Sequence, residues 1–347
     1  MLIGDLDQLL AAEISALPPP PPATAGSWQP APPGGAPAPG RYATAVAFRL
    51  ADGHPAEAPR IAMRLAAGLR RAGWVCSATV TGGYVTVTVT PDALARVAVR
   101  ITAAGPMCAR STALAGAAAP APPEPDLAAA ASWEDARRQL AAFLTGRLAE
   151  AAGARTCPSS PAERQAVPGR RPSPAPGPVA AALEFAGAGA IRYALARLPP
   201  GTPARVDPGH AAAHRLDVPA YAVRYAHAHA ASALRQAADL GLSPGEAAEF
   251  GPRLLAHPSE QALLDELSWL PERVAGAARR ARPDLFPRYL ERLAGAYFDC
   301  HERCPAAWPG MGAGGPQAVA RLRLAAATAT ALRAGLDLLG VDAPGRL

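Results

Sequence analysis

The sequence DVPAYAVRYAHAHAASALRQA, residues 217–237, is a strong helix signal. Pro219 stands where proline opens a helix, and Gly241 stands where glycine commonly follows a helix end. The residues between them are rich in alanine, which has the highest helix propensity. These features predict one helix over 219–240.

More helices are expected around this one, joined by short loops. Proline stands at three further predicted helix starts, and Gly340 follows the end of the last helix. Alternating helices and short loops are typical of a helical bundle, here of roughly 130 residues at the C-terminus. The other expected helices cover 179–198, 207–215, 244–255, 258–280, 283–304 and 316–338.

The first part of the chain has a mixed pattern. Residues 74–90, WVCSATVTGGYVTVTVT, alternate as two strands around a Gly-Gly turn, and Thr90 is expected to cap a helix opened by Pro91. Residues 1–117 are therefore predicted to form a small α+β domain with a Pro-rich insert at 18–39. Apolar spacing predicts its other helices at 2–16, 40–53 and 56–73.

Residues 118–178 are expected to be a low-complexity linker with one helix at 133–152, opened by the capping box that starts at Ser132. Large apolar residues are almost absent from 153–178, which predicts disorder there.

The composition excludes two classes of enzyme. All 34 basic residues of the Lys+Arg count are arginine, so a P-loop lysine and a Schiff-base lysine are both impossible. The absence of Lys and Asn, together with the abundance of alanine, indicates a high-GC coding bias. The net charge of +6 and the pI near 9.4 permit nucleic-acid binding without requiring it.

Cysteine usage and the first residues bear on location. Five cysteines without a CxxC motif are typical of reduced thiols in a cytoplasm. The first 17 residues contain acids and no basic segment, unlike a signal peptide, and proline interrupts the long uncharged stretches. We expect a cytoplasmic protein without membrane contact.

Several short motifs have simpler interpretations than catalysis. Ser243 in GLSPG has the letters of a nucleophile elbow, but it follows a helix and is better read as a helix cap. The glycine-rich segment 310–315 has no strand before it, so a loop is favoured over a dinucleotide site. Two pairs lack the remaining ligands of a metal site: Cys300 with Cys304, and His210 with His214. No metal, no cofactor and no catalytic residue are therefore expected.

Arginines cluster where two predicted C-terminal helices meet, with Tyr289 among them. Such a cluster suits phosphate contacts, although interleaved acids leave a salt-bridged surface as an alternative. The candidate phosphate contacts are Arg279, Arg280, Arg288 and Arg292.

Four C-terminal segments, in order, resemble the anticodon-binding (DALR) domain of arginyl-tRNA synthetases. They are DVPAYAVRYAHAHAASALRQA at 217–237, HPSEQALLDELSWLPERV at 257–274, RYLERLAGAYFDC at 288–300 and ARLRLAAATATALRAGLDLLGVDAPGRL at 320–347. The resemblance implies that 219–347 is a helical DALR anticodon-binding domain. Within the segment 179–218, residues 186–207 resemble the stretch of chain that leaves the family's catalytic domain, with Gly189 where the family has Asp. GRYATAVAFRLA and GGYVTVTV resemble the same enzymes' N-terminal additional domain, which contacts the tRNA D-arm.

The resemblance also implies which residues face RNA. Tyr225 matches the tyrosine of the family's Tyr-Ala-His-Ala-Arg segment, and His229 replaces its arginine. Cys300 and His301 stand where the family has Phe and Tyr, and Leu347 stands where it has Met. A core tyrosine and merely surface histidines remain the alternatives for Tyr225, His229 and His301. The anticodon-side set comprises Tyr221, Arg224, Tyr225, His229, Tyr297, His301 and Leu347.

The two ends of the chain resemble tRNA-holding domains, but the catalytic signatures are missing. No His-x-Gly-His motif occurs, and without lysine the second signature loop cannot form. The chain is therefore similar to the synthetase-related anticodon-binding proteins (NrtL type), which lack the catalytic domain. We expect a non-catalytic tRNA-binding protein, with arginine tRNA a candidate. The alternatives are a protein-interaction or regulatory module, whose partner would be arginyl-tRNA synthetase or another protein, and a surviving arginine-tRNA ligase.

Overall fold

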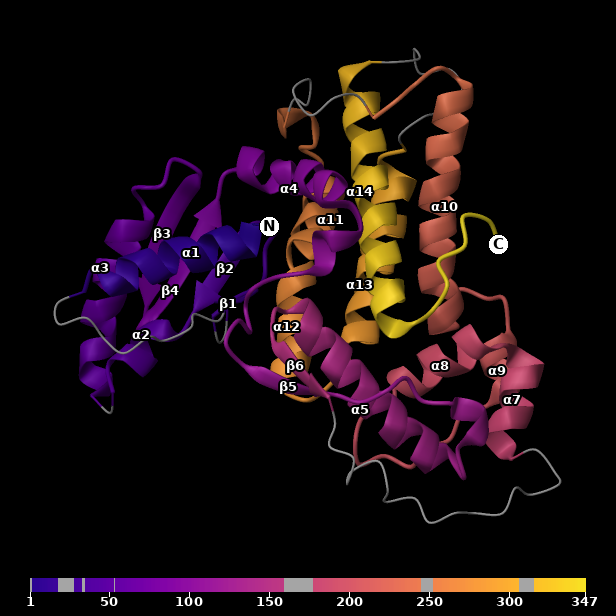
Figure 1. Cartoon of the computed structure of the whole chain (residues 1–347). Helices are drawn as coiled ribbons and strands as arrows, with labels where there is room; N and C mark the ends of the chain where they lie inside the picture. Colours follow the sequence, from indigo (N-terminus) through magenta and orange to yellow (C-terminus); the bar gives the residue numbers. More distant parts are fainter. Residues whose placement is uncertain are drawn as a thin grey trace.

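The computed structural model describes residues 2–17, 28–32, 35–52, 54–158, 177–244, 252–305 and 315–347. An N-terminal unit built around a small sheet lies beside a C-terminal bundle of long helices, and a group of shorter helices packs below that bundle (Figure 1). The expected α+β plus all-α fold class is confirmed.

The N-terminal unit is a four-stranded antiparallel sheet with helices packed on it. Its strands pair in the order β1-β2-β4-β3, and the predicted hairpin of β3 and β4 turns at Gly82 and Gly83, both of which have positive φ. Helix α1 buries Leu2, Leu6 and Leu10, one to two turns apart, against this unit. The elements are α1 (Leu2–Ser15), β1 (Trp28–Gln29), β2 (Arg41–Thr44), α2 (Val46–Leu50), α3 (Ala58–Leu69), β3 (Val75–Thr81), β4 (Tyr84–Val89) and α4 (Pro91–Ala104).

The helix predicted over 40–53 is wrong in its first half. Residues Arg41–Thr44 form strand β2, which pairs with β4 in the register Tyr42 opposite Val87, and only Val46–Leu50 is helical. Sheet hydrogen bonding to β4 outweighs the local helix propensity of this alanine-containing stretch. The Thr90 cap is confirmed, because its hydroxyl oxygen accepts from the Ala93 amide at 3.2 Å.

The N-terminal unit docks directly on the bundle. The Gly40 amide donates to Asp265 Oδ1 at 2.9 Å, and the Tyr42 hydroxyl lies 3.0 Å from Ser268 Oγ. The Tyr42 ring packs on Trp269, with 5.4 Å between ring centroids. Since Tyr42 is fully buried, these contacts belong to a closed interface between the two units.

The segment expected to be a linker contains a helix that is part of the core. Its Ser132 cap is confirmed by a hydrogen bond from the Asp135 amide at 3.2 Å, and Leu140, Leu144 and Leu148 are fully buried. This helix packs on α8 (Ala188–Ala196) and α12 (Leu270–Arg279), so the proposed linker is anchored to the bundle through it. The elements here are the 3₁₀ helix η2 (Gly105–Ala109), a parallel pair β5 (Ala118–Ala121) and β6 (Arg155–Pro158) that the sequence did not predict, and α5 (Trp133–Ala151).

The C-terminal bundle has the expected helices, with two additional breaks. The helix predicted over 179–198 is divided at Gly187, whose φ is +83, and the one predicted over 258–280 is divided at Trp269. Of the helix expected at 244–255, residues 245–251 lie outside the described residues, and Pro252–Leu254 forms one 3₁₀ turn. The helices are α7 (Pro178–Ala186), α8 (Ala188–Ala196), α9 (Pro208–Ala212), α10 (Pro219–Asp239), α11 (Pro258–Ser268), α12 (Leu270–Arg279), α13 (Leu285–Arg303) and α14 (Pro316–Leu339).

None of the helices in the described part of the chain has both the length and the apolar character that a bilayer span requires. Most of the Pro-rich insert and of the stretch predicted to be disordered, namely 18–27, 33–34 and 159–176, lies outside that part.

Candidate RNA-binding site

Helix α10 carries a row of rings on one face. It buries Val223, Ala226 and Ala230 in the bundle, and the side chains at 221, 225 and 229 lie on a partly exposed face. The rings of Tyr221 and Tyr225 stack with 5.7 Å between centroids. The Tyr225 and His229 rings lie 5.9 Å apart. This spacing of four residues forms a continuous aromatic strip.

Helix α13 widens the strip at its second half. Phe298 stacks on Tyr225 at 5.8 Å between centroids, and the His301 ring meets the edge of His229 at 4.4 Å. Residues 297 and 298 come to this place together with 301 because each lies about one turn before 301, on the helix side that faces α10. We call the six rings of Tyr221, Tyr225, His229, Tyr297, Phe298 and His301 the aromatic cluster.

The members of the aromatic cluster differ in exposure. Tyr297 is only 3% exposed, and its hydroxyl oxygen lies 2.9 Å from His229 Nδ1. Tyr225, His229, Phe298 and His301 are partly exposed. Tyr297 therefore supports the cluster from below, and the others offer ring surface to a ligand.

Burial also sets the charge of the two histidines. It lowers the pKa of His229, and the neighbouring His301 lowers it further. Burial likewise lowers the pKa of His301, against a smaller opposing effect of Glu302. Both imidazoles are consequently neutral at pH 7, where each can donate one hydrogen bond and accept another.

A groove of about 650 Å³ lies between α10 and the C-terminal residues, and Tyr225 and His229 form one end of it. Two hydrogen bonds hold its far wall: Arg235 donates to the Gly345 carbonyl at 2.8 Å, and His227 Nδ1 lies 3.0 Å from the Pro344 carbonyl oxygen. The groove combines ring faces with hydrogen-bonding and charged groups. Its polar lining includes Ser232, Arg235, Gln236, Asp239 and Arg346.

Two members of the anticodon-side set lie differently from the rest. Leu347 lines the groove and is 54% exposed, so it is available to a ligand there. Arg224 does not line the groove, and its Nε is buried without a hydrogen-bond partner among the described residues. The structure thus brings Tyr221, Tyr225, His229, Tyr297, His301 and Leu347 to one side of the bundle, and of these Tyr225, His229 and Leu347 line the groove. Arg224 belongs neither to the aromatic cluster nor to the groove.

The predicted phosphate-contact arginines form a separate group on α12 and the first half of α13. Arg279 pairs with Glu272 at 3.4 Å, and Arg292 lies 3.8 Å from Glu266. Arg288 donates to the Arg197 carbonyl at 3.3 Å. Arg280 is exposed and has no ion pair within the described ranges. The salt-bridged surface weighed as the alternative is thus present here.

Tyr289 is not a stacking plane between these arginines. It is fully buried, and its hydroxyl donates to the Glu266 carbonyl at 2.7 Å. Arg292 covers its ring at 5.7 Å from the centroid. The periodicity of α13 places this position on the buried side, which outweighs its proximity to arginine in the sequence.

The discarded motifs show no chemistry in the described part of the chain. Cys300 and Cys304 are buried, and burial raises the pKa of the Cys300 thiol to about 12. No group of three or more metal-binding side chains occurs among the described residues. Gly245 of the GLSPG motif and 310–314 of the glycine-rich segment lie outside them.

Sequence reasoning missed several residues of this site. Phe298 is next to Tyr297 and one turn before His301, so the helical periodicity of α13 could have shown it. Ser232, Gln236 and Asp239 continue the face of Tyr225 and His229 along α10 at intervals of three and four. His214 stacks on Tyr221 at 5.3 Å between centroids, a contact across a loop that no spacing rule predicts.

The fold and the groove define a helical module with an aromatic face, and comparison with known proteins shows which one. Residues 223–347 match the family model of the DALR anticodon binding domain. The C-terminal part of this chain is therefore a DALR anticodon-binding domain, related in sequence to arginyl-tRNA synthetases.

Two curated relatives illustrate the relationship. The chain is 39% identical to the arginine–tRNA ligase of Micrococcus luteus over 170 residues and 39% identical to that of Frankia alni over 166 residues. Each match covers 48% of this chain and 30% of the relative, so the chain spans less than a third of their length. The solved arginyl-tRNA synthetase of Thermus thermophilus superposes with a TM-score of 0.71 at 14% identity, covering all of both chains, and shares the fold.

Proposed function

We propose that this chain is a non-catalytic tRNA-binding protein that holds tRNA by its anticodon loop and its D-arm side. The observation that carries the proposal is the partly exposed aromatic cluster beside a charged groove within a DALR anticodon-binding domain. Unpaired loop bases are held in proteins by stacking on aromatic planes and by hydrogen bonds to their edges. The groove offers both kinds of contact.

Each part of the cluster has a role in this proposal. Tyr225 stacks an unpaired base, and the neutral imidazoles of His229 and His301 hydrogen-bond its edge. Arg235 and Arg346 supply positive charge to the phosphates that follow. The N-terminal unit, docked through Tyr42, is assigned to the D-arm side.

The proposed absence of catalysis rests on composition. The chain contains no lysine. Adenylation requires groups that stabilise the charge on the ATP phosphates in the transition state. We expect purified protein, freed of host synthetase, to give no arginine-dependent ATP–pyrophosphate exchange. Detectable exchange would favour the ligase alternative.

The test of RNA binding compares Tyr225→Ala with Tyr225→Phe on full-length tRNA and on an isolated anticodon stem-loop. Loss of one base–aromatic stack costs about 1–3 kcal/mol, so the alanine variant should bind both RNAs roughly tenfold or more weakly. The phenylalanine variant keeps the ring and should bind like the parent. Melting temperatures of all three proteins separate loss of binding from loss of folding.

Two outcomes would contradict the proposal. A folded Tyr225→Ala protein that binds the stem-loop as tightly as the parent removes the aromatic cluster from the site. If the parent binds no tRNA even at low salt, the protein-interaction module is favoured instead, with arginyl-tRNA synthetase as the first partner to test. Comparison of arginine tRNA with other tRNAs measures the specificity.

A further inference from the structure

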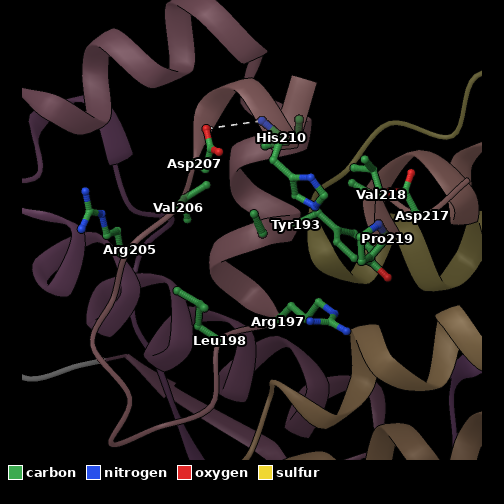
Figure 2. Close-up of a pocket in the computed structure, with 14 residues that line it drawn as sticks. Tyr193, Arg197, Leu198, Arg205, Val206, Asp207, His210, Asp217, Val218 and Pro219 are labelled. Atoms are coloured by element: carbon green, nitrogen blue, oxygen red, sulfur yellow. Dashed lines mark hydrogen bonds between the residues drawn. The ribbon is translucent and has the colours of Figure 1, made fainter. Parts of the chain in front are cut away.

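Two hollows lie along α10, and their walls are fixed in different ways. The first, of about 330 Å³, lies where α8, α9 and the start of α10 meet (Figure 2). Its edge at α9 is a capped helix start, because Asp207 accepts from the Gly209 and His210 amides at 2.9 and 3.4 Å. The second is the groove beside the aromatic cluster. One of its walls consists of residues 345–347, which form neither helix nor strand, so other contacts must hold that wall in place.

The chain that leads to this wall is anchored at the end of α14. Gly340, whose φ is +67, ends the helix, and the Val341 amide donates to the Leu336 carbonyl at 3.0 Å. The Val341 side chain is buried. Helix capping and burial therefore fix the chain as far as Val341. We call the residues that follow, 342–347, the C-terminal segment.

Two side chains of α10 hold the C-terminal segment. His227 Nδ1 lies 3.0 Å from the Pro344 carbonyl oxygen, and Arg235 donates to the next carbonyl, that of Gly345, at 2.8 Å. The side chains beyond these bonds, at positions 346 and 347, are exposed and line the groove. Ordering a flexible segment costs conformational entropy, so a segment that is already held presents its side chains to a ligand at a lower cost.

His227 differs from Arg235 in its access to the groove. Arg235 lines the groove, whereas His227 is 5% exposed and does not. Burial lowers the pKa of His227, so its imidazole is neutral at pH 7. A carbonyl oxygen can only accept, so the single ring proton is on Nδ1, and the ring donates to Pro344. The polar contact through which His227 can influence a ligand in the groove is therefore its bond to the C-terminal segment.

We propose that His227 is a positioning residue for RNA binding, which keeps Arg346 and Leu347 at the wall of the groove by holding Pro344. This inference rests on the proposed function, because it assigns the C-terminal segment to the RNA in that groove. Arg346 supplies charge to a phosphate, and Leu347 supplies apolar surface beside a base. Loss of the His227 bond leaves both side chains in the protein but releases them from the wall.

The first test compares His227→Leu with His227→Asn. Leucine is close to histidine in volume and has no hydrogen-bonding group, whereas the asparagine amide nitrogen is the same number of bonds from the backbone as Nδ1. One hydrogen bond changes an equilibrium by about three- to tenfold. His227→Leu should therefore bind the anticodon stem-loop about three- to tenfold more weakly than the parent, and His227→Asn should recover most of that loss.

The matched control for stability is Thr328→Val. It also removes a buried hydrogen bond, from the Thr328 hydroxyl to the Leu324 carbonyl at 2.9 Å, and Thr328 does not line the groove. Thr328→Val should bind the stem-loop like the parent at temperatures where all the proteins are folded.

Three further measurements separate positioning from a general loss of stability. In the full chain without RNA, the heteronuclear ¹⁵N NOE of the Leu347 amide should fall in His227→Leu and remain near the parent's value in His227→Asn. The salt slope of stem-loop binding should be smaller for His227→Leu, by up to the roughly 0.7–0.9 that one phosphate contact contributes. In the R346A/L347A protein, His227→Leu should have no further effect on affinity.

Several results would overturn the inference. An unchanged Leu347 NOE in His227→Leu shows that His227 does not hold the segment. Stem-loop binding by His227→Leu equal to the parent's, an equal loss in Thr328→Val, or a full His227→Leu effect in the R346A/L347A protein removes the role in RNA binding. Failure of the proposed function looks different. A parent that binds no RNA contradicts both proposals, whereas unchanged binding by Tyr225→Ala contradicts the role of the aromatic cluster even where His227→Leu binds more weakly.

Discussion

The Nδ1 atom of His229 lies 2.9 Å from the hydroxyl oxygen of Tyr297, and this contact joins α10 to α13 beneath the aromatic cluster. Tyr297 is buried, so it holds the His229 ring in one orientation, and His301 packs on that ring. A ligand meeting the cluster therefore finds rings that are already ordered. Preorganisation of this kind reduces the conformational cost of binding.

His229 should make folding sensitive to acid. Its pKa is lowered in the folded protein from the value of 6.5, so as pH falls below that value the unfolded chain takes up a proton first. The resulting stability is fully present above pH 6.5 and is lost as pH falls through the lowered pKa. We expect the melting temperature of the parent to fall further than that of His229→Phe between about pH 7.5 and pH 5.

The quantity to measure is the difference in melting temperature between the parent and His229→Phe, because buried carboxyls change stability with pH in the opposite direction. Burial raises the pKa of Asp265 and of Glu266, so both take up protons in the folded state. If parent and His229→Phe have parallel profiles, the histidine does not titrate as described.

Asp7 should destabilise the protein at alkaline pH. Burial, followed by the charge of Glu272, raises its pKa to about 7 from the ordinary value of 3.8. Between about pH 4 and pH 7 the folded state holds a proton that the unfolded chain has lost, and above pH 7 the folded state carries a costly buried charge. Asp7→Asn should therefore melt a few degrees higher than the parent at about pH 8, on the scale of roughly 2–4 °C per kcal/mol.

This advantage of Asp7→Asn should shrink by about pH 5, where Asp7 itself is protonated. Asp5→Asn is the matched control, since it removes an exposed pair with Arg100, worth about 0–1 kcal/mol. An equal effect of Asp7→Asn at both pH values would contradict the assignment.

Two glycines of neighbouring helices should respond oppositely to alanine. A Cβ at Gly335 of α14 would lie 2.5 Å from Leu290 Cδ2, so Gly335→Ala should overpack the core and cost about 1–3 kcal/mol. A Cβ at Gly295 of α13 meets nothing within 4 Å, so Gly295→Ala should stabilise by about 0.5–1 kcal/mol. Urea unfolding of both variants checks the signs, and destabilisation by Gly295→Ala would be inconsistent with the described packing.

RNA binding should depend on salt through a small number of arginines. With about five phosphate contacts, the slope of log K against log salt should be roughly −3 to −5. Arg346→Ala should reduce that slope by about 0.7–0.9, because Arg346 lines the groove and is exposed. Arg279→Ala should change it less, since Glu272 already neutralises that cation. Equal effects of the two variants would mean that the groove is not where phosphate lies.

Sequence patterns predicted most helices because their caps are local. Thr90 and Ser132 cap through bonds to amides three residues away, and proline marks the starts of α10, α11 and α14. Strand β2 was read as helix because its pairing with β4 is not local. Likewise, the burial of Tyr289 and the stacking of His214 on Tyr221 depend on contacts between separate segments. Residue types and local spacing therefore suggested the cluster, whereas the contact of His214 with it and the groove beside it required the folded chain.

The hydrogen bonds of Gly40 and Tyr42 to Asp265 and Ser268 hold the N-terminal unit at a fixed distance from the aromatic cluster. The sheet and the aromatic cluster are separated by packed side chains rather than by a tether, so neither can move to meet a ligand independently of the other. A nucleic acid that touched both would have to match the one distance that separates these two contact points. Molecules with the right spacing between the two contact points would fit without strain, and shorter or longer ones would have to bend.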